Sequence, residues 1–106
     1  MTRCIEHIAY IITPSSLDAF RDIKSKVAAE AHDLPGLISS TTQQSVTDPH
    51  AFVDTMVWES KDAAVAGLAA FEKLPTTPAF LGMMAGPPQF MGQYEWTAGD
   101  RSLELV

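Results

Sequence analysis

The alternation of apolar and polar positions along the chain predicts four strands. The segment from Arg3 to Ile12 is rich in isoleucine and stops before Thr13-Pro14, which is typical of a strand with a turn after it. The segment from Leu37 to Val46 is rich in β-branched residues but polar, as in an edge strand. Phe52 to Glu59 and Gln89 to Trp96 complete the predicted set.

The first and third of these strands are apolar on both faces. In residues 3–12, one face carries Ile5, Ala9 and Ile11, and the other carries Ile8, Tyr10 and Ile12. In residues 52–59, one face carries Phe52, Asp54, Met56 and Trp58, and the other carries Val53, Thr55 and Val57. Strands of this kind need to be covered on both sides. The short turn at residues 48–50 joins the second and third strands as an antiparallel hairpin.

Two segments show the apolar spacing of amphipathic helices. The first opens at Pro14, with Ser15 and Asp18 as a variant of the capping box, and ends at Pro35-Gly36. Its predicted buried stripe is Leu17, Phe20, Ile23 or Lys24, Val27, Ala31 and Leu34. The second runs over residues 61–74 after the capping residue Ser60. Its predicted stripe is Ala64, Val65, Leu68, Phe71 and Leu74, and residues 79–84 form a further short turn.

The resulting order, β-α-β-β-α-β, predicts an α+β fold of the ferredoxin-like kind. This fold is a four-stranded antiparallel sheet with two helices on one face. The other face of the sheet then carries apolar side chains without cover. An exposed apolar face of that size is unfavourable for a monomer, so we expect a homodimer in which the two bare faces pack together.

Composition narrows the choice of partners and compartment. The 106 residues indicate one domain over 1–106, with a core of about 3–96 and a tail, 97–106, that we expect to contact the partner subunit. The net charge of −6 disfavours nucleic acid. No apolar run is long enough for a membrane span, and we identify no signal peptide. The lone cysteine, Cys4, fits a reducing compartment, so we expect a cytoplasmic protein.

Three segments resemble the antibiotic-biosynthesis-monooxygenase-like family of the dimeric α+β barrel superfamily. They are Pro35-Gly36 after the first helix, residues 52–60 running into Asp62-Ala63, and Met91-Gly92-Gln93-Tyr94-Glu95 in the last strand. The resemblance covers about residues 3–96. It implies a ferredoxin-like fold and a dimer whose sheets form a barrel. Members of the family include cofactor-independent monooxygenases of aromatic, polyketide-like substrates, and also haem-degrading monooxygenases.

The resemblance does not extend to haem degradation. That branch uses an Asn in the first strand, a Trp in the second helix and a downstream His. This sequence contains no asparagine, its residues 61–74 contain no tryptophan, and no histidine follows His50. The three histidines show no metal-binding spacing, and there is no dinucleotide or phosphate-binding motif. We therefore expect no cofactor.

Candidate site residues follow from residue chemistry and from the expected cavity between sheet and helices. His7 is the candidate proton shuttle and is expected to face this cavity, and Tyr94 is a second catalytic candidate because its hydroxyl can contact a substrate oxygen. The candidate pocket residues are Trp58, Asp54, Met83, Met84 and Phe71. For each, a purely structural role is the alternative: a core or interface histidine, packed aromatic rings, an ion-paired carboxylate and gap-filling methionines.

Two functions remain open from the sequence. One is a small-molecule-binding homodimer with cofactor-independent monooxygenase or isomerase activity on an aromatic or polyketide-like compound. The other is a non-catalytic dimer with a ligand-sensing or structural role. A cavity of roughly 300 Å³ or more, lined by His7, Trp58 and Tyr94, favours the first function. Tight packing at that place favours the second.

Overall fold

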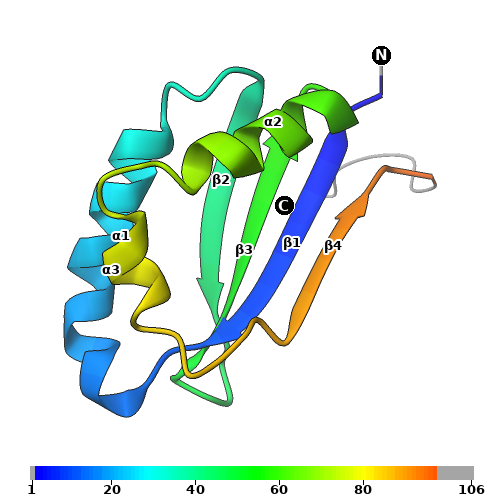
Figure 1. Ribbon diagram of the computed structural model, residues 1–106. Coiled ribbons are helices and arrows are strands. Elements are labelled where there is room, and N and C mark those ends of the chain that lie inside the picture. Colours follow the sequence, from blue (N-terminus) through cyan, green and yellow to red (C-terminus); the bar gives the residue numbers. More distant parts are fainter. Residues whose placement is uncertain (1, 98–106) are drawn as a thin grey trace.

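The computed structural model describes residues 2–97 and contains one four-stranded sheet with helices beside it (Figure 1). The strands are β1 (Cys4–Ile11), β2 (Leu37–Gln44), β3 (Ala51–Trp58) and β4 (Phe90–Tyr94). The helices are the 3-10 turn η1 (Pro14–Ser16), α1 (Leu17–Ala31), α2 (Lys61–Phe71) and the short α3 (Thr77–Leu81). The predicted order of strands and long helices is confirmed.

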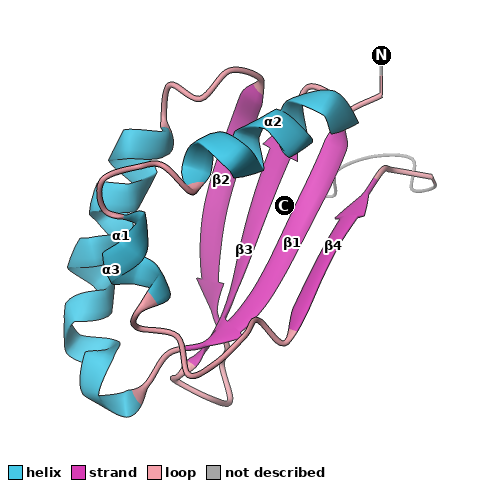
Figure 2. Cartoon of the chain, viewed as in Figure 1, coloured by secondary structure: helices cyan, strands magenta, loops and turns pink. Residues whose placement is uncertain are grey.

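The sheet has the strand order β2-β3-β1-β4, and all of its neighbouring strands are antiparallel (Figure 2). β1 and β3 are therefore the central strands, and β2 lies at an edge, as its polar sequence predicts. The register pairs Ile8 with Asp54 and Tyr10 with Phe52, so these four side chains share one face. This arrangement is the ferredoxin-like α+β fold that the sequence predicts.

The helices cover the face of the sheet that carries Tyr10 and Phe52. Phe20 of α1 packs 4.4 Å from Phe52 between ring centroids, and Phe80 of α3 packs 5.4 Å from Tyr10. A second cluster joins Cys4, Trp58 and Ala64 of α2. Since both clusters lie on the same side of the sheet, α1, α2 and α3 together enclose the space above β1 and β3.

The ends of the first helix differ from the prediction. The capping box of Ser15 and Asp18 does not form, because η1 precedes α1 and Thr13 Oγ1 instead donates to Ser16 Oγ at 2.9 Å. At its other end, α1 stops at Ala31, and Pro35-Gly36 form the turn into β2. Gly36 has φ +82°, and a Cβ there would lie 2.6 Å from Cβ of Ala63 at the start of α2, so glycine is required.

The buried stripe of α2 is rotated relative to the prediction. Val65, predicted to be buried, is 55% exposed, whereas Ala64 and Gly67 are buried. The reason is Trp58, which is 2% exposed and whose indole ring fills the place where a side chain at Gly67 would stand. The predicted cap is confirmed, since the Ser60 side chain accepts a hydrogen bond from the Ala63 backbone N–H.

The second face of the sheet has no helix over it in the described part of the chain. It carries Ile5, His7, Ala9, Ile11, Val53, Thr55, Val57, Phe90 and Tyr94. Phe90 and Tyr94 are stacked on each other and are nearly half exposed.

Within residues 2–97, none of the helices has the length and hydrophobicity that crossing a membrane requires. We predict that the tail, residues 97–106, contacts the partner subunit. Residues 98–106 of this tail lie outside the described residues.

Candidate functional site

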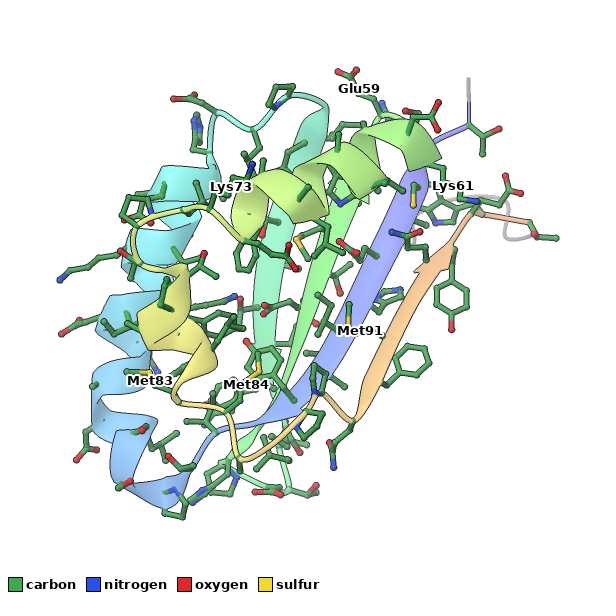
Figure 3. All side chains as sticks on the ribbon, viewed as in Figure 1. Glu59, Lys61, Lys73, Met83, Met84 and Met91 are labelled. Atoms are coloured by element: carbon green, nitrogen blue, oxygen red, sulfur yellow. The ribbon has the colours of Figure 1, made fainter. Side chains whose placement is uncertain are left out.

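A cavity of about 850 Å³ lies between the sheet and the helices. Its walls are mainly apolar and include Phe20, Phe52, Phe71 and Leu68. Figure 3 labels Met84 and Met91, which line the cavity from the connection between α3 and β4 and from β4 itself. A volume of this size is within the usual range for small-molecule sites, roughly 300–1,000 Å³.

Asp54 is the centre of a buried polar network on the floor of this cavity. Its Oδ1 accepts hydrogen bonds of 2.8 Å from the Tyr10 hydroxyl and from Thr42 Oγ1. Its Oδ2 accepts from Lys24 Nζ, which forms an ion pair with it. The two side chains are 16% (Lys24) and 7% (Asp54) exposed, so water screens this pair only weakly. The network thus connects β1, α1, β2 and β3.

Tyr10 acts in this network only as a hydrogen-bond donor. Burial raises the pKa of its hydroxyl far above the usual value, and the negative charge of Asp54 and the hydrogen bond to it raise that pKa further. The hydroxyl therefore keeps its proton throughout the physiological pH range. Lys24 Nζ also lies 4.2 Å from the centre of the Phe80 ring, where the ring face stabilises its positive charge.

A second carboxylate, Glu6, lines the cavity and is 3% exposed. Its Oε1 accepts a hydrogen bond of 3.3 Å from Trp58 Nε1, and its Oε2 accepts one of 3.4 Å from Gln93 Nε2. Nearby, burial and the negative charge of Glu6 raise the pKa of the Cys4 thiol, while Lys61 lowers it. The thiol is therefore protonated near neutral pH and is a poor nucleophile, so Cys4 acts as a small apolar side chain of the core.

His7 and Tyr94 do not face the cavity, and the prediction that His7 does so is wrong. Both lie on the opposite face of the sheet, with ring centroids 5.8 Å apart. His7 Nδ1 is 3.1 Å from Thr55 Oγ1 and forms a hydrogen bond with it. The physical reason is strand parity, since successive side chains of β1 alternate between the two faces and the helices cover the face of Glu6 and Tyr10.

Four of the five predicted pocket residues line the cavity: Trp58, Asp54, Met84 and Phe71. The fifth, Met83, packs against the aromatic core instead of lining the cavity. Within residues 2–97, no group of three or more His, Cys, Asp or Glu side chains is placed to hold a metal ion. The cavity therefore combines apolar walls with three carboxylates, Glu6, Asp54 and Glu72, and with the two cations of α1, Arg21 and Lys24.

Solved structures share this fold over most of the chain. A protein from Chloroflexus aurantiacus J-10-fl, provisionally named an antibiotic biosynthesis monooxygenase, superposes with a TM-score of 0.71 at 22% identity, covering 94% of this chain and 98% of its own. SnoaB, a cofactor-independent oxygenase from Streptomyces nogalater, superposes with a TM-score of 0.72 at 18% identity, covering 98% and 99%. This chain has the fold of antibiotic biosynthesis monooxygenases. The resemblance seen in the sequence is confirmed at the level of the fold.

The monooxygenase fold is also found in proteins whose activity is not stated. A conserved protein from Methanosarcina mazei Go1 superposes with a TM-score of 0.76 at 12% identity, covering 89% of this chain and 92% of its own. No protein-family model matches the sequence, and neither does any curated protein. The activity must therefore be argued from the cavity and its side chains, because one fold supports many activities.

Sequence reasoning missed Lys24 and Glu6, which line the cavity, and Tyr10, whose hydroxyl donates to the cavity residue Asp54. A signal existed for Lys24, because its position satisfies the spacing of the buried stripe of α1 as well as Ile23 does. A signal existed for Glu6 too, since a carboxylate in the middle of an otherwise apolar strand needs a specific partner. In the sequence Tyr10 is one of the apolar positions of its strand, and nothing there indicates that its hydroxyl donates a hydrogen bond to Asp54.

Proposed function

We propose that this protein is a cytoplasmic, small-molecule-binding homodimer that acts as a cofactor-independent monooxygenase on an aromatic or polyketide-like compound. The observation that carries the proposal is the cavity of about 850 Å³, with aromatic and aliphatic walls and buried charged groups on its floor. Of the three residues expected to line it, Trp58 does so and His7 and Tyr94 do not. Apolar walls bind flat rings, and a few polar groups fix their orientation. The fold shared with SnoaB, a cofactor-independent oxygenase, supports this choice of reaction.

Oxygenation without a metal or flavin requires that the substrate itself supply the electrons. An activated methylene carbon loses a proton, and the resulting carbanion reduces O₂. One oxygen atom remains on the carbon as a carbonyl, and the other leaves as water with the two hydrogens. Lys24 Nζ has three N–H donors, of which Asp54 uses one, so the others can stabilise the substrate oxygen on which the negative charge gathers.

Oxygen uptake with anthrone tests this proposal, because anthrone is flat and has a methylene group between two aryl rings. We expect the protein to accelerate uptake and to form anthraquinone. Ala28 lines the cavity, so Ala28→Trp should fill it and reduce the rate at least about tenfold. Ala29, also exposed on α1 but outside the lining, offers the matched control Ala29→Trp, which should keep the wild-type rate. Equal rates with and without protein would contradict the enzymatic proposal.

One observation favours a non-catalytic, ligand-sensing role as the second candidate. Asp54 accepts three hydrogen bonds, one of them from a lysine, so the protein's own donors occupy most of the sites at which it could take a proton from a substrate. The same experiment separates the two roles. Binding of anthrone that is lost in Ala28→Trp, without acceleration of oxygen uptake, would favour the sensing role.

The uncovered face of the sheet supports the homodimer in this proposal. The side chains of β1, β3 and β4 on this face are apolar or neutral and include no Asp, Glu, Lys or Arg. Each copy has a net charge of −6, so two copies repel one another when their charged surfaces meet. Contact through the uncovered face avoids this repulsion, because that face carries no Asp, Glu, Lys or Arg on β1, β3 and β4. A two-fold axis would place the same apolar patch of both copies in contact.

Sedimentation at micromolar concentration checks the homodimer. We expect the wild type to be a dimer and Phe90→Glu, on the uncovered face, to be a monomer, because the substitution would bury a charge from each copy in an apolar contact. Val65→Glu introduces the same charge at an exposed position of α2 on the other side of the molecule and should remain dimeric. A monomeric wild type would refute the dimer without affecting the cavity.

A further inference from the structure

Glu6 differs from Asp54 in what surrounds its charge. Within residues 2–97, a Lys, Arg or His nitrogen lies within salt-bridge distance of a carboxylate only at Lys24–Asp54 and His32–Asp33, so Glu6 has no cationic partner there. Its two hydrogen bonds, to Trp58 Nε1 and Gln93 Nε2, are 3.3 and 3.4 Å long and come from neutral donors. Bonds of this length are at or beyond the upper end of the normal range for N–H···O hydrogen bonds.

A buried carboxylate in this situation has unused capacity to accept hydrogen bonds. Its two oxygens offer about four lone-pair sites, and the two long bonds occupy only part of them. Because Glu6 is 3% exposed, bulk water does little to satisfy the remainder. Its side chain does line the cavity, so a molecule bound there can donate a hydrogen bond to it.

The position of Glu6 relative to the rest of the floor sets the kind of molecule that fits. Glu6 pairs with Met56 and Ile8 pairs with Asp54, so the two carboxylates are diagonal neighbours on adjacent strands. Diagonal neighbours lie roughly 7–8 Å apart at Cα, which is comparable with the width of a fused aromatic ring system. Asp54 already accepts three hydrogen bonds from the protein's own donors, whereas Glu6 accepts two long ones, so a ligand donor is directed to Glu6.

We propose that Glu6 is the specificity-determining residue of the cavity and selects fused-ring phenols, whose hydroxyl donates a hydrogen bond to its carboxylate. This inference rests on the proposed function and adds to it the residue that selects among aromatic compounds. The rings contact the apolar wall, and the hydroxyl is held beside Trp58. A compound of the same shape without a hydroxyl leaves the carboxylate unsatisfied, and a site built around a hydrogen bond discriminates strongly against such a compound.

Calorimetric titration with 2-naphthol and its methyl ether, 2-methoxynaphthalene, tests this assignment. Hydrogen bonds to charged groups are worth about 1.5–3 kcal/mol, so the wild type should bind 2-naphthol at least about tenfold more tightly than the ether. In Glu6→Gln, which keeps the shape and removes the charge, the ratio should fall below about threefold. Glu59 is an exposed carboxylate outside the cavity lining, and Glu59→Gln should keep the wild-type ratio.

The outcomes separate this inference from the function on which it rests. Equal affinity of the wild type for the two compounds would overturn the role of Glu6 and leave the aromatic cavity standing. An equal loss of preference in Glu59→Gln and Glu6→Gln would also overturn it, because the effect would then not depend on position. If neither compound binds the wild type, both the aromatic site and the role of Glu6 are wrong. The wild-type ratio is informative even where a variant fails to fold.

Discussion

Lys24→Met should lower the free energy of unfolding by about 3 kcal/mol, the largest effect that we expect from a single substitution in this protein. Methionine keeps the apolar stem of the lysine but removes the charge opposite Asp54. The Asp54 side chain is 7% exposed and would remain buried without its counter-ion. The contact of the ammonium with the Phe80 ring is lost as well. Urea denaturation followed by circular dichroism measures the change.

Two further variants separate the ion pair from general effects of the substitution. Lys26 is exposed on the same helix, and Lys26→Met should change the stability by no more than about 0.5 kcal/mol. In the double variant Lys24→Met/Asp54→Asn the buried group is a neutral amide, so about 1 kcal/mol or more should be recovered. If Lys24→Met were as stable as Lys26→Met, the ion pair would contribute little to the fold.

Gly67→Ala should destabilise the protein by about 2 kcal/mol, although Gly to Ala inside a helix normally stabilises by about 1 kcal/mol. A Cβ at this position would fall 2.1 Å from Cη2 of Trp58, whose ring is fully enclosed. Either α2 moves away from the sheet or the indole moves into the cavity. Thermal or urea unfolding measures the loss of stability.

The control for this prediction is Gly82→Ala at the end of α3, where the nearest atom to a new Cβ is 3.4 Å away. Its stability should stay within about 0.5 kcal/mol of the wild type. In a Trp58→Phe background the smaller ring leaves room, so Gly67→Ala should no longer destabilise. Equal destabilisation in both backgrounds would show that the close approach to Trp58 is not the cause.

The order and sides of the elements could be predicted because they depend on local periodicity. Alternation in residues 3–12 predicts that Tyr10 shares a face with Ile8, and alternation in residues 52–59 predicts that Trp58 shares a face with Asp54. Both predictions are confirmed. Ser60 could be recognised as a cap because its side chain bonds a backbone group three residues away. The rotation of α2 could not be predicted, since it depends on Trp58 filling the space beside Gly67.

The candidate site could be predicted only in part, because strand parity sorts side chains into two groups without saying which group the helices cover. Both faces of β1 are apolar, so His7 and Glu6 were equally able to face the cavity. Glu6 does so, and His7 lies on the uncovered face with Tyr94. The Lys24–Asp54 pair joins residues 30 positions apart, and a single sequence carries no information on such a pairing.

The carboxylate of Asp54 also has a consequence for the way in which the molecule opens. Its donors come from β1, α1 and β2, so three separate segments depend on one anion in β3. If α1 detached alone, Asp54 would remain buried without Lys24. If β2 detached alone, Asp54 would lose the hydrogen bond from the Thr42 hydroxyl. Detachment of any one segment therefore costs free energy at Asp54, in a different strand. We expect these segments to unfold together, as one cooperative unit.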